Sequence, residues 1–148
     1  MTYSSTKTPF TQESDTSISP TGMRAVVADD NEALAQTTGW MLELLGYEVQ
    51  LAADGLQALA ISRAFQPDVV LIDIGLPELS GYDVCRQLRA DPAFAHSLII
   101  AHSGWSQPEH LQRSQAAGFD YHLVKPVDME GLEKLLIALR KTPSDTAH

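Results

Sequence analysis

Cysteine, long apolar runs and positive charge are all scarce in this chain of 148 residues. The single cysteine, Cys85, excludes an internal disulfide, as is common in proteins of a reducing compartment. No apolar run approaches the roughly 20 residues that a membrane-spanning helix needs, and the N-terminus lacks the features of a secretory signal peptide. These absences predict a cytoplasmic protein that does not enter a membrane.

Positive charge is outnumbered, because 10 lysines and arginines face 19 aspartates and glutamates and give a net charge of -9 at pH 7. Binding to a phosphate backbone requires cations, so the composition argues against direct contact with nucleic acid. The chain does have 44% hydrophobic and 20% charged residues, the balance of a soluble globular protein with a core. Its length suits one domain rather than two.

Residues 1–22 differ from the rest in composition, since half of them are serine or threonine. Such a segment cannot bury enough apolar surface to offset the entropy lost on ordering, so we expect a disordered N-terminal tail. We expect one folded domain over residues 23–142 and a short C-terminal tail over residues 143–148.

Short strand patterns alternate with helical patterns in the expected domain. The runs at 25–28, 69–72 and 98–101 are apolar throughout, which is typical of strands buried on both faces. Those at 48–52 and 121–124 mix polar and apolar residues, as edge strands do. The pattern predicts an α/β protein with five helices and a five-stranded parallel sheet of order 2-1-3-4-5, the flavodoxin-like doubly wound fold.

The expected helices differ in the apolar surface that they offer to a core. The fourth, over residues 108–117, has Leu111 as its only large apolar residue, whereas the fifth has four leucines at helical spacing. Because buried apolar area contributes roughly 25 cal/mol per Å², the fourth helix should be held more weakly. On the first helix we expect Trp40 to be partly buried, and we expect an apolar side formed by Leu34, Met41, Leu44 and Leu45.

Polar residues follow four of the five strand patterns. Asp29 and Asp30 come after the first strand, Asp73 after the third, Ser103 after the fourth and Lys125 after the fifth. Ligands of open parallel sheets bind beyond the carboxyl ends of the strands, so we expect these side chains to meet. Each residue alone also fits a helix cap, a turn or a solvated lysine, but their coincidence at one rim favours a functional site.

Phosphoryl transfer is the chemistry that suits this set. Three neighbouring carboxylates repel one another unless a cation joins them, and hard oxygen ligands favour Mg²⁺. One carboxylate can then attack phosphorus and form an aspartyl phosphate, whose oxygens a lysine and a hydroxyl can hold.

Four motifs surround these polar residues, namely Val27-Ala28-Asp29-Asp30-Asn31, Leu71-Ile72-Asp73-Ile74-Gly75-Leu76-Pro77 with Gly81-Tyr82-Asp83, Ala101-His102-Ser103-Gly104, and Val124-Lys125-Pro126. With these motifs the sequence resembles response-regulator receiver domains of two-component signalling. The resemblance covers about residues 24–141, in order and at the expected separations.

The resemblance implies a role for each matched residue. Asp73 would be the phosphoacceptor, and Lys125 and Ser103 would contact its phosphoryl group. Asp30 and Asp73 would bind Mg²⁺ together with the backbone carbonyl of Gly75. The partners would be a sensor histidine kinase, a histidine phosphotransfer protein or both, and then a downstream protein target. The domain would be no enzyme beyond catalysing its own phosphorylation and dephosphorylation.

The resemblance has further implications at other matched positions. Asp29 would act on the metal mostly through water, and the Lys125–Pro126 peptide would be cis, as it commonly is in the family. The switch position, three residues before the lysine, is often Tyr or Phe in the family and here is His122. Only seven residues follow Lys141, so we expect a stand-alone receiver.

Three other functions remain open. A hydrolase of the haloacid dehalogenase type also forms an aspartyl phosphate, but it usually carries an acid where this chain has Gly75. A flavin carrier of the same fold would need a phosphate-binding loop where Asp29 and Asp30 stand. A receiver fold that is never phosphorylated would serve only as an interaction module.

Overall fold

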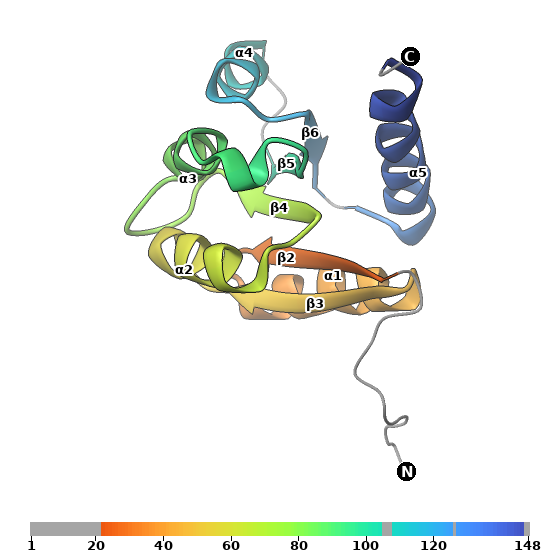
Figure 1. The fold of residues 1–148 in the computed structure, drawn as a ribbon. Coiled ribbons are helices and arrows are strands. Elements are labelled where there is room, and N and C mark those ends of the chain that lie inside the picture. Colours follow the sequence, from red (N-terminus) through yellow and green to blue (C-terminus); the bar gives the residue numbers. More distant parts are fainter. Residues whose placement is uncertain (1–21, 105–107, 126, 147–148) are drawn as a thin grey trace.

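A five-stranded sheet organises the computed structural model, which describes residues 22–104, 108–125 and 127–146 (Figure 1). All but the last residue of the expected N-terminal tail lie outside the described residues. The strands are β2 (Met23–Ala28), β3 (Tyr47–Ala52), β4 (Val69–Asp73), β5 (Leu98–Ser103) and β6 (Tyr121–Val124). The helices are α1 (Glu32–Leu44), α2 (Gly55–Phe65), α3 (Gly81–Arg89), the short 3₁₀ helix η1 (Pro92–Phe94), α4 (Pro108–Ala117) and α5 (Met129–Thr146).

The strands pair in parallel in the order β3-β2-β4-β5-β6. This order confirms the predicted order 2-1-3-4-5 and places the two mixed strands, β3 and β6, at the edges. Helices α1 and α5 cover one face of the sheet, and α2, α3 and α4 cover the other (Figure 1). Each face has its own core cluster, because the inner strands are apolar on both sides.

The packing of α5 agrees with its sequence pattern. Leu132 and Leu136 are fully buried, and Leu135 and Leu139 pack partly buried against the same cluster. The helix continues to Thr146, so it extends into the segment that the sequence assigns to a C-terminal tail. None of the described helices has the length and apolar character that a membrane span requires.

The expected apolar side of α1 is wrong in part. Leu34 is 42% exposed and Leu44 is 79% exposed, whereas Met41 and Leu45 do pack against the core. Trp40, which we expected to be partly buried, is 57% exposed. The side that faces the sheet consists largely of small residues, with Ala35, Thr38, Gly39 and Leu42 buried.

Gly39 explains why the helix turns its small residues to the sheet. A Cβ atom at Gly39 would lie 3.2 Å from the Leu51 side chain and 3.4 Å from that of Val49. The glycine therefore lets α1 lie close to β3, and this close packing directs the larger side chains of the helix outward.

Candidate functional site

Three carboxylates meet at the carboxyl end of the sheet. Asp29 and Asp30 follow β2, and Asp73 is the last residue of β4. One carboxylate oxygen of each lies within 4.8 Å of the others. Asp29 is buried, at 3% exposure, and Asp30 is exposed. The residue that caps α1 is Asn31, whose side chain accepts from the Leu34 N–H, so neither aspartate is needed for that cap.

Lys125, which follows β6, joins two of these carboxylates. Its Nζ donates to Asp29 Oδ2 at 2.8 Å and to Asp73 Oδ2 at 3.3 Å. Its backbone N–H donates to the Ser103 carbonyl at 2.7 Å, which fixes the chain just beyond the two neighbouring strands. Residues distant in sequence thus form one ion-paired cluster, as the strand-end pattern predicts. Pro126, and with it the expected cis peptide, lies outside the described residues.

Backbone N–H groups orient the other carboxylate oxygens. The Asn31 N–H donates to Asp29 Oδ1 at 2.9 Å, and the Gly75 N–H donates to Asp73 Oδ1 at 3.0 Å. Each of the two carboxylates is therefore held through both oxygens, one by backbone and one by Lys125. This arrangement orients the Asp73 carboxylate before any ligand binds.

Gly81 lets α3 begin directly behind the acidic cluster. A Cβ atom at this position would lie 2.6 Å from the Asp73 carbonyl oxygen and 2.6 Å from the Ile74 Cα. A larger residue would push the end of β4 out of place. The sequence motif includes this glycine, but only the structure gives the reason for it.

The environment shifts the proton affinities of Asp73 and Lys125. Burial raises the pKa of Asp73, while the Gly75 N–H and the Lys125 charge lower it. For Lys125, burial by itself lowers the pKa, but the hydrogen bond to Asp29 and the charges of Asp73 and Asp29 outweigh burial and raise it. Lys125 therefore remains a fixed positive charge beside the carboxylates at neutral pH.

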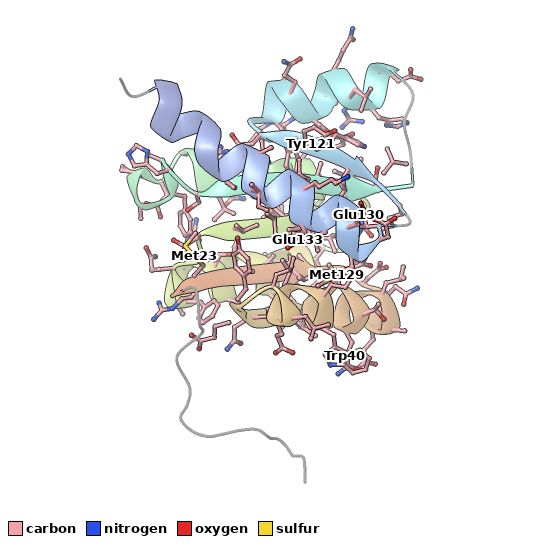
Figure 2. The ribbon with its side chains drawn as sticks, turned by 90° about the vertical axis from the view of Figure 1, so that its right-hand side faces the viewer. Met23, Trp40, Tyr121, Met129, Glu130 and Glu133 are labelled. Carbon is pink, nitrogen blue, oxygen red and sulfur yellow. The ribbon has the colours of Figure 1, made fainter. Side chains whose placement is uncertain are left out.

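Ser103 and His122 form a separate polar chain behind the cluster. The Ser103 hydroxyl lies 3.0 Å from His122 Nε2, and the Ser114 hydroxyl lies 2.8 Å from His122 Nδ1. Both serines are buried. The neighbouring Tyr121, labelled in Figure 2, lies on the opposite face of β6 by strand alternation and is 47% exposed. His122 thus links the end of β5 to α4.

Sequence reasoning missed His102, which pairs in register with Asp73. Its side chain is buried, and its Nε2 has no hydrogen-bond partner among the described residues. Burial and the Lys125 charge lower its pKa to about 4, so the ring is neutral at pH 7. The sequence feature that could have identified His102 is the presence of a histidine at the end of an otherwise apolar run.

The residues present fit a magnesium ion. Mg²⁺ prefers hard oxygen ligands and commonly uses one or two carboxylates while keeping several waters. Asp29, Asp30 and Asp73 supply carboxylate oxygens at one spot, and the exposed Asp30 leaves that spot open to solvent. The acidic cluster is the only such group of potential ligands among the described residues.

Comparison with known proteins agrees with this geometry. The family model of the response regulator receiver domain matches residues 25–137. The polar-differentiation response regulator DivK of Brucella anthropi is 31% identical over 104 residues, which are 70% of this chain and 85% of DivK. The response regulator MprA of Mycolicibacterium vanbaalenii is 36% identical over 127 residues, 84% of this chain and 54% of MprA. The chain thus spans about half the length of MprA, and likewise 50% of the transcriptional regulator RpaA of Synechocystis.

Comparison with solved structures points to the same family. The chemotaxis response regulator CheY4 of Vibrio cholerae superposes with a TM-score of 0.75 at 30% identity and covers 79% of this chain and 98% of its own. The receiver domain of the sensor histidine kinase PA1611 from Pseudomonas aeruginosa, which has a magnesium ion coordinated in its active site cleft, gives a TM-score of 0.71 at 31% identity. It covers 77% of this chain and 93% of its own. By sequence and by fold, the chain belongs to the response regulator receiver domain family.

Proposed function

We propose that this chain is a phospho-accepting receiver of a two-component phosphorelay and that Asp73 is its phosphoacceptor. The observation that carries the proposal is the placement of the Asp73 carboxylate. One of its oxygens is held by the Gly75 N–H and the other by Lys125, beside Asp29 and Asp30. Its family is one of signalling domains, which favours this function over a hydrolase of the haloacid dehalogenase type.

In the proposed reaction, an Asp73 oxygen attacks the phosphorus of a phosphohistidine on a partner protein. A new P–O bond forms, the P–N bond breaks, and its electron pair returns to the imidazole nitrogen, which takes up a proton. Lys125 stays charged throughout and neutralises the phosphoryl oxygens. Asp29, Asp30 and Asp73, with the Gly75 carbonyl, would hold Mg²⁺, which supplies further charge neutralisation when bound.

The Ser103–His122–Ser114 chain is the proposed route by which phosphorylation is sensed. A phosphoryl group on Asp73 offers the Ser103 hydroxyl a charged acceptor, and hydrogen bonds to charged acceptors are stronger than ordinary ones. His122 would then lose its partner at Nε2 and change its contact with Ser114 in α4. The surface of α4, β6 and α5 is therefore the proposed phosphorylation-sensitive partner face.

The proposed partners are a sensor histidine kinase, a histidine phosphotransfer protein or both, and a downstream protein that reads the α4–β6–α5 face. We place this exchange in the cytoplasm. The net charge of -9 supports a protein target rather than direct binding to nucleic acid.

The proposal is tested by incubating the protein with Mg²⁺ and acetyl phosphate. We expect one acid-stable, base-labile phosphoryl group, which Asp73→Asn abolishes. Asp83→Asn is the matched control, because Asp83 is a nearby surface aspartate paired with Arg86. Persistent labelling of the Asp73→Asn variant would identify another acceptor and overturn the assignment.

Amide hydrogen exchange with and without beryllium fluoride, a stable phosphoryl mimic, tests the output route. We expect the largest changes between Ser103 and Ala117. Changes centred on α2 instead would contradict the proposed partner face.

A further inference from the structure

One long stretch of the chain contains no positively charged residue. Between Ala25 and Ser62 the sequence contains no lysine or arginine. This stretch supplies α1, β3 and most of α2. Arg24, directly before it, donates to the Phe65 carbonyl and lies near Glu48. The field on this side is set by Asp29, Asp30, Glu32, Glu43, Glu48 and Asp54, and it attracts cations.

The same side exposes large apolar side chains. Trp40 is 57% exposed, Leu44 is 79% exposed and Leu51 is 39% exposed. Trp40 and Leu44 are four residues apart on α1, so they lie next to each other on the helix surface. Figure 2 shows Trp40 on the outer side of α1, pointing away from the sheet. Neighbouring exposed apolar groups of this size are typical of a surface that another molecule covers.

A groove runs along the seam between α1 and β3. Its lower part, of about 150 Å³, is lined by residues that include Trp40, Glu43 and Leu51. Its upper part, of about 390 Å³, is lined by residues that include Leu51, Glu32 and Asp30. Leu51 lines both parts, so the two hollows adjoin at this side chain. Together their linings combine apolar residues such as Val49 and Leu51 with the acidic residues Asp30, Glu32 and Glu43.

Glu43 is an exposed acidic residue that lines this groove. It lies in the last turn of α1, where the helix dipole disfavours a negative charge. Partial burial in the groove raises the pKa of its carboxyl. Among the described residues it has neither a salt bridge nor a side-chain hydrogen bond, whereas Glu48 lies near Arg24 and Glu130 pairs with Lys134. The Glu43 carboxylate is therefore available to pair with a lysine or arginine of another molecule.

We propose that the α1–β3 groove binds a basic amphipathic segment of a second protein. Its apolar side chains would cover Trp40 and Leu51, and a lysine or arginine would pair with Glu43. A second copy of this chain is a poor occupant, because it would bring one acidic groove against another. The proposal goes beyond the phosphoacceptor function and needs no phosphoryl group, since the groove lies away from the α4–β6–α5 face.

Trp40 itself reports on binding. The chain has two tryptophans, so Trp105→Phe leaves Trp40 as the only one. The probe is a helical peptide that repeats Leu-Lys-Lys-Leu, and its charge-reversed control repeats Leu-Glu-Glu-Leu. We expect the basic peptide to shift the fluorescence emission of Trp40 to shorter wavelengths. We also expect it to reduce the quenching of that fluorescence by acrylamide. We expect amide NMR shifts in α1 and β3, and no effect of the acidic peptide.

A matched pair of double variants separates the groove from general attraction by net charge. Glu32→Gln/Glu43→Gln and Glu130→Gln/Glu133→Gln remove the same charge, the second pair lying on α5 (Figure 2). We expect the first to weaken peptide binding about tenfold and the second less than about twofold. Leu44→Ala should also weaken binding without a change of charge. Equal weakening by both double variants, or peptide shifts centred on α4 and β6, would overturn the proposal. Labelling of Asp73 tests the phosphoacceptor function separately.

Discussion

The acidic cluster and the Ser103–His122–Ser114 chain lie at the same end of the sheet, yet different forces hold them together. In the cluster, Lys125 pairs with two carboxylates, and the Asp29 side chain is only 2% exposed. In the chain, an imidazole lies between two hydroxyls. Loss of one partner from a buried ion pair leaves a charge without compensation, whereas loss of a neutral hydrogen bond leaves only a polar atom. We therefore expect the cluster to set stability and chemistry, and the chain to be loose enough to switch.

The largest effect is expected from Lys125→Met without metal. This change leaves Asp29 buried and unpaired, so the free energy of unfolding should fall by about 3 to 5 kcal/mol. Urea denaturation measures it. Adding Asp29→Asn should recover part of the lost stability, because it removes the unpaired negative charge of Asp29. If Lys125→Met were as stable as the parent, the ion pairs would not hold this end of the sheet together.

His102 belongs to neither group, because it is buried and its Nε2 has no hydrogen-bond partner among the described residues. Its pKa is about 4 in the folded protein against 6.5 for an ordinary histidine, so between these values the unfolded chain binds a proton that the folded chain does not. Neutral His102 therefore makes its full contribution to the free energy of unfolding above pH 6.5. This contribution falls by up to about 3 kcal/mol as the pH drops to 4.

His102→Leu should remove this component of acid sensitivity and also the unpartnered Nε2. We expect the variant to be more stable than the parent at pH 7, by about 1 to 2 kcal/mol, with a larger difference at pH 5. Urea denaturation at several pH values measures both. If the difference in free energy of unfolding between variant and parent were the same at pH 7 and at pH 5, His102 would not be buried in its neutral form.

Metal affinity should separate the members of the cluster. Asp30→Ala is expected to weaken Mg²⁺ binding by roughly a hundredfold, or about 2.7 kcal/mol, because it removes an exposed carboxylate ligand. Gly75→Ala should have little effect, since Gly75 would offer only its carbonyl. Removal of one of three crowded carboxylates should also leave the metal-free protein at least as stable as the parent. Isothermal titration calorimetry measures the Mg²⁺ affinity of each variant. Equal Mg²⁺ affinity in Asp30→Ala and the parent would contradict the proposed set of ligands.

The smallest effect is expected from Ser114→Ala, which removes the hydrogen bond between the Ser114 hydroxyl and His122 Nδ1. The free energy of unfolding should fall by about 1 kcal/mol, with faster amide exchange in α4 and unchanged labelling of Asp73. A loss as large as that of Lys125→Met would remove the distinction between the cluster and the chain.

Residue patterns alone were enough to predict the sheet and the edge of it that holds the site. Strands that are apolar throughout must be buried on both faces, and this requirement fixed β2, β4 and β5 as the inner strands. Because the carboxyl ends of parallel strands meet at one edge, Asp29, Asp73 and Lys125 could be placed together before any contact was known. The roles of these residues in phosphoryl transfer stay predictions.

The neighbour that each side chain contacts could not be predicted from these patterns and depends on the three-dimensional fold. Apolar spacing could not show that α1 turns Ala35 and Gly39 to the sheet and leaves Trp40 outside, because the distance of closest approach between helix and strand makes that choice. Likewise, local sequence could not pair His122 with Ser114 or leave His102 Nε2 without a partner. Such contacts depend on the positions of elements that are distant in the chain, and residue spacing within one element carries no information about them.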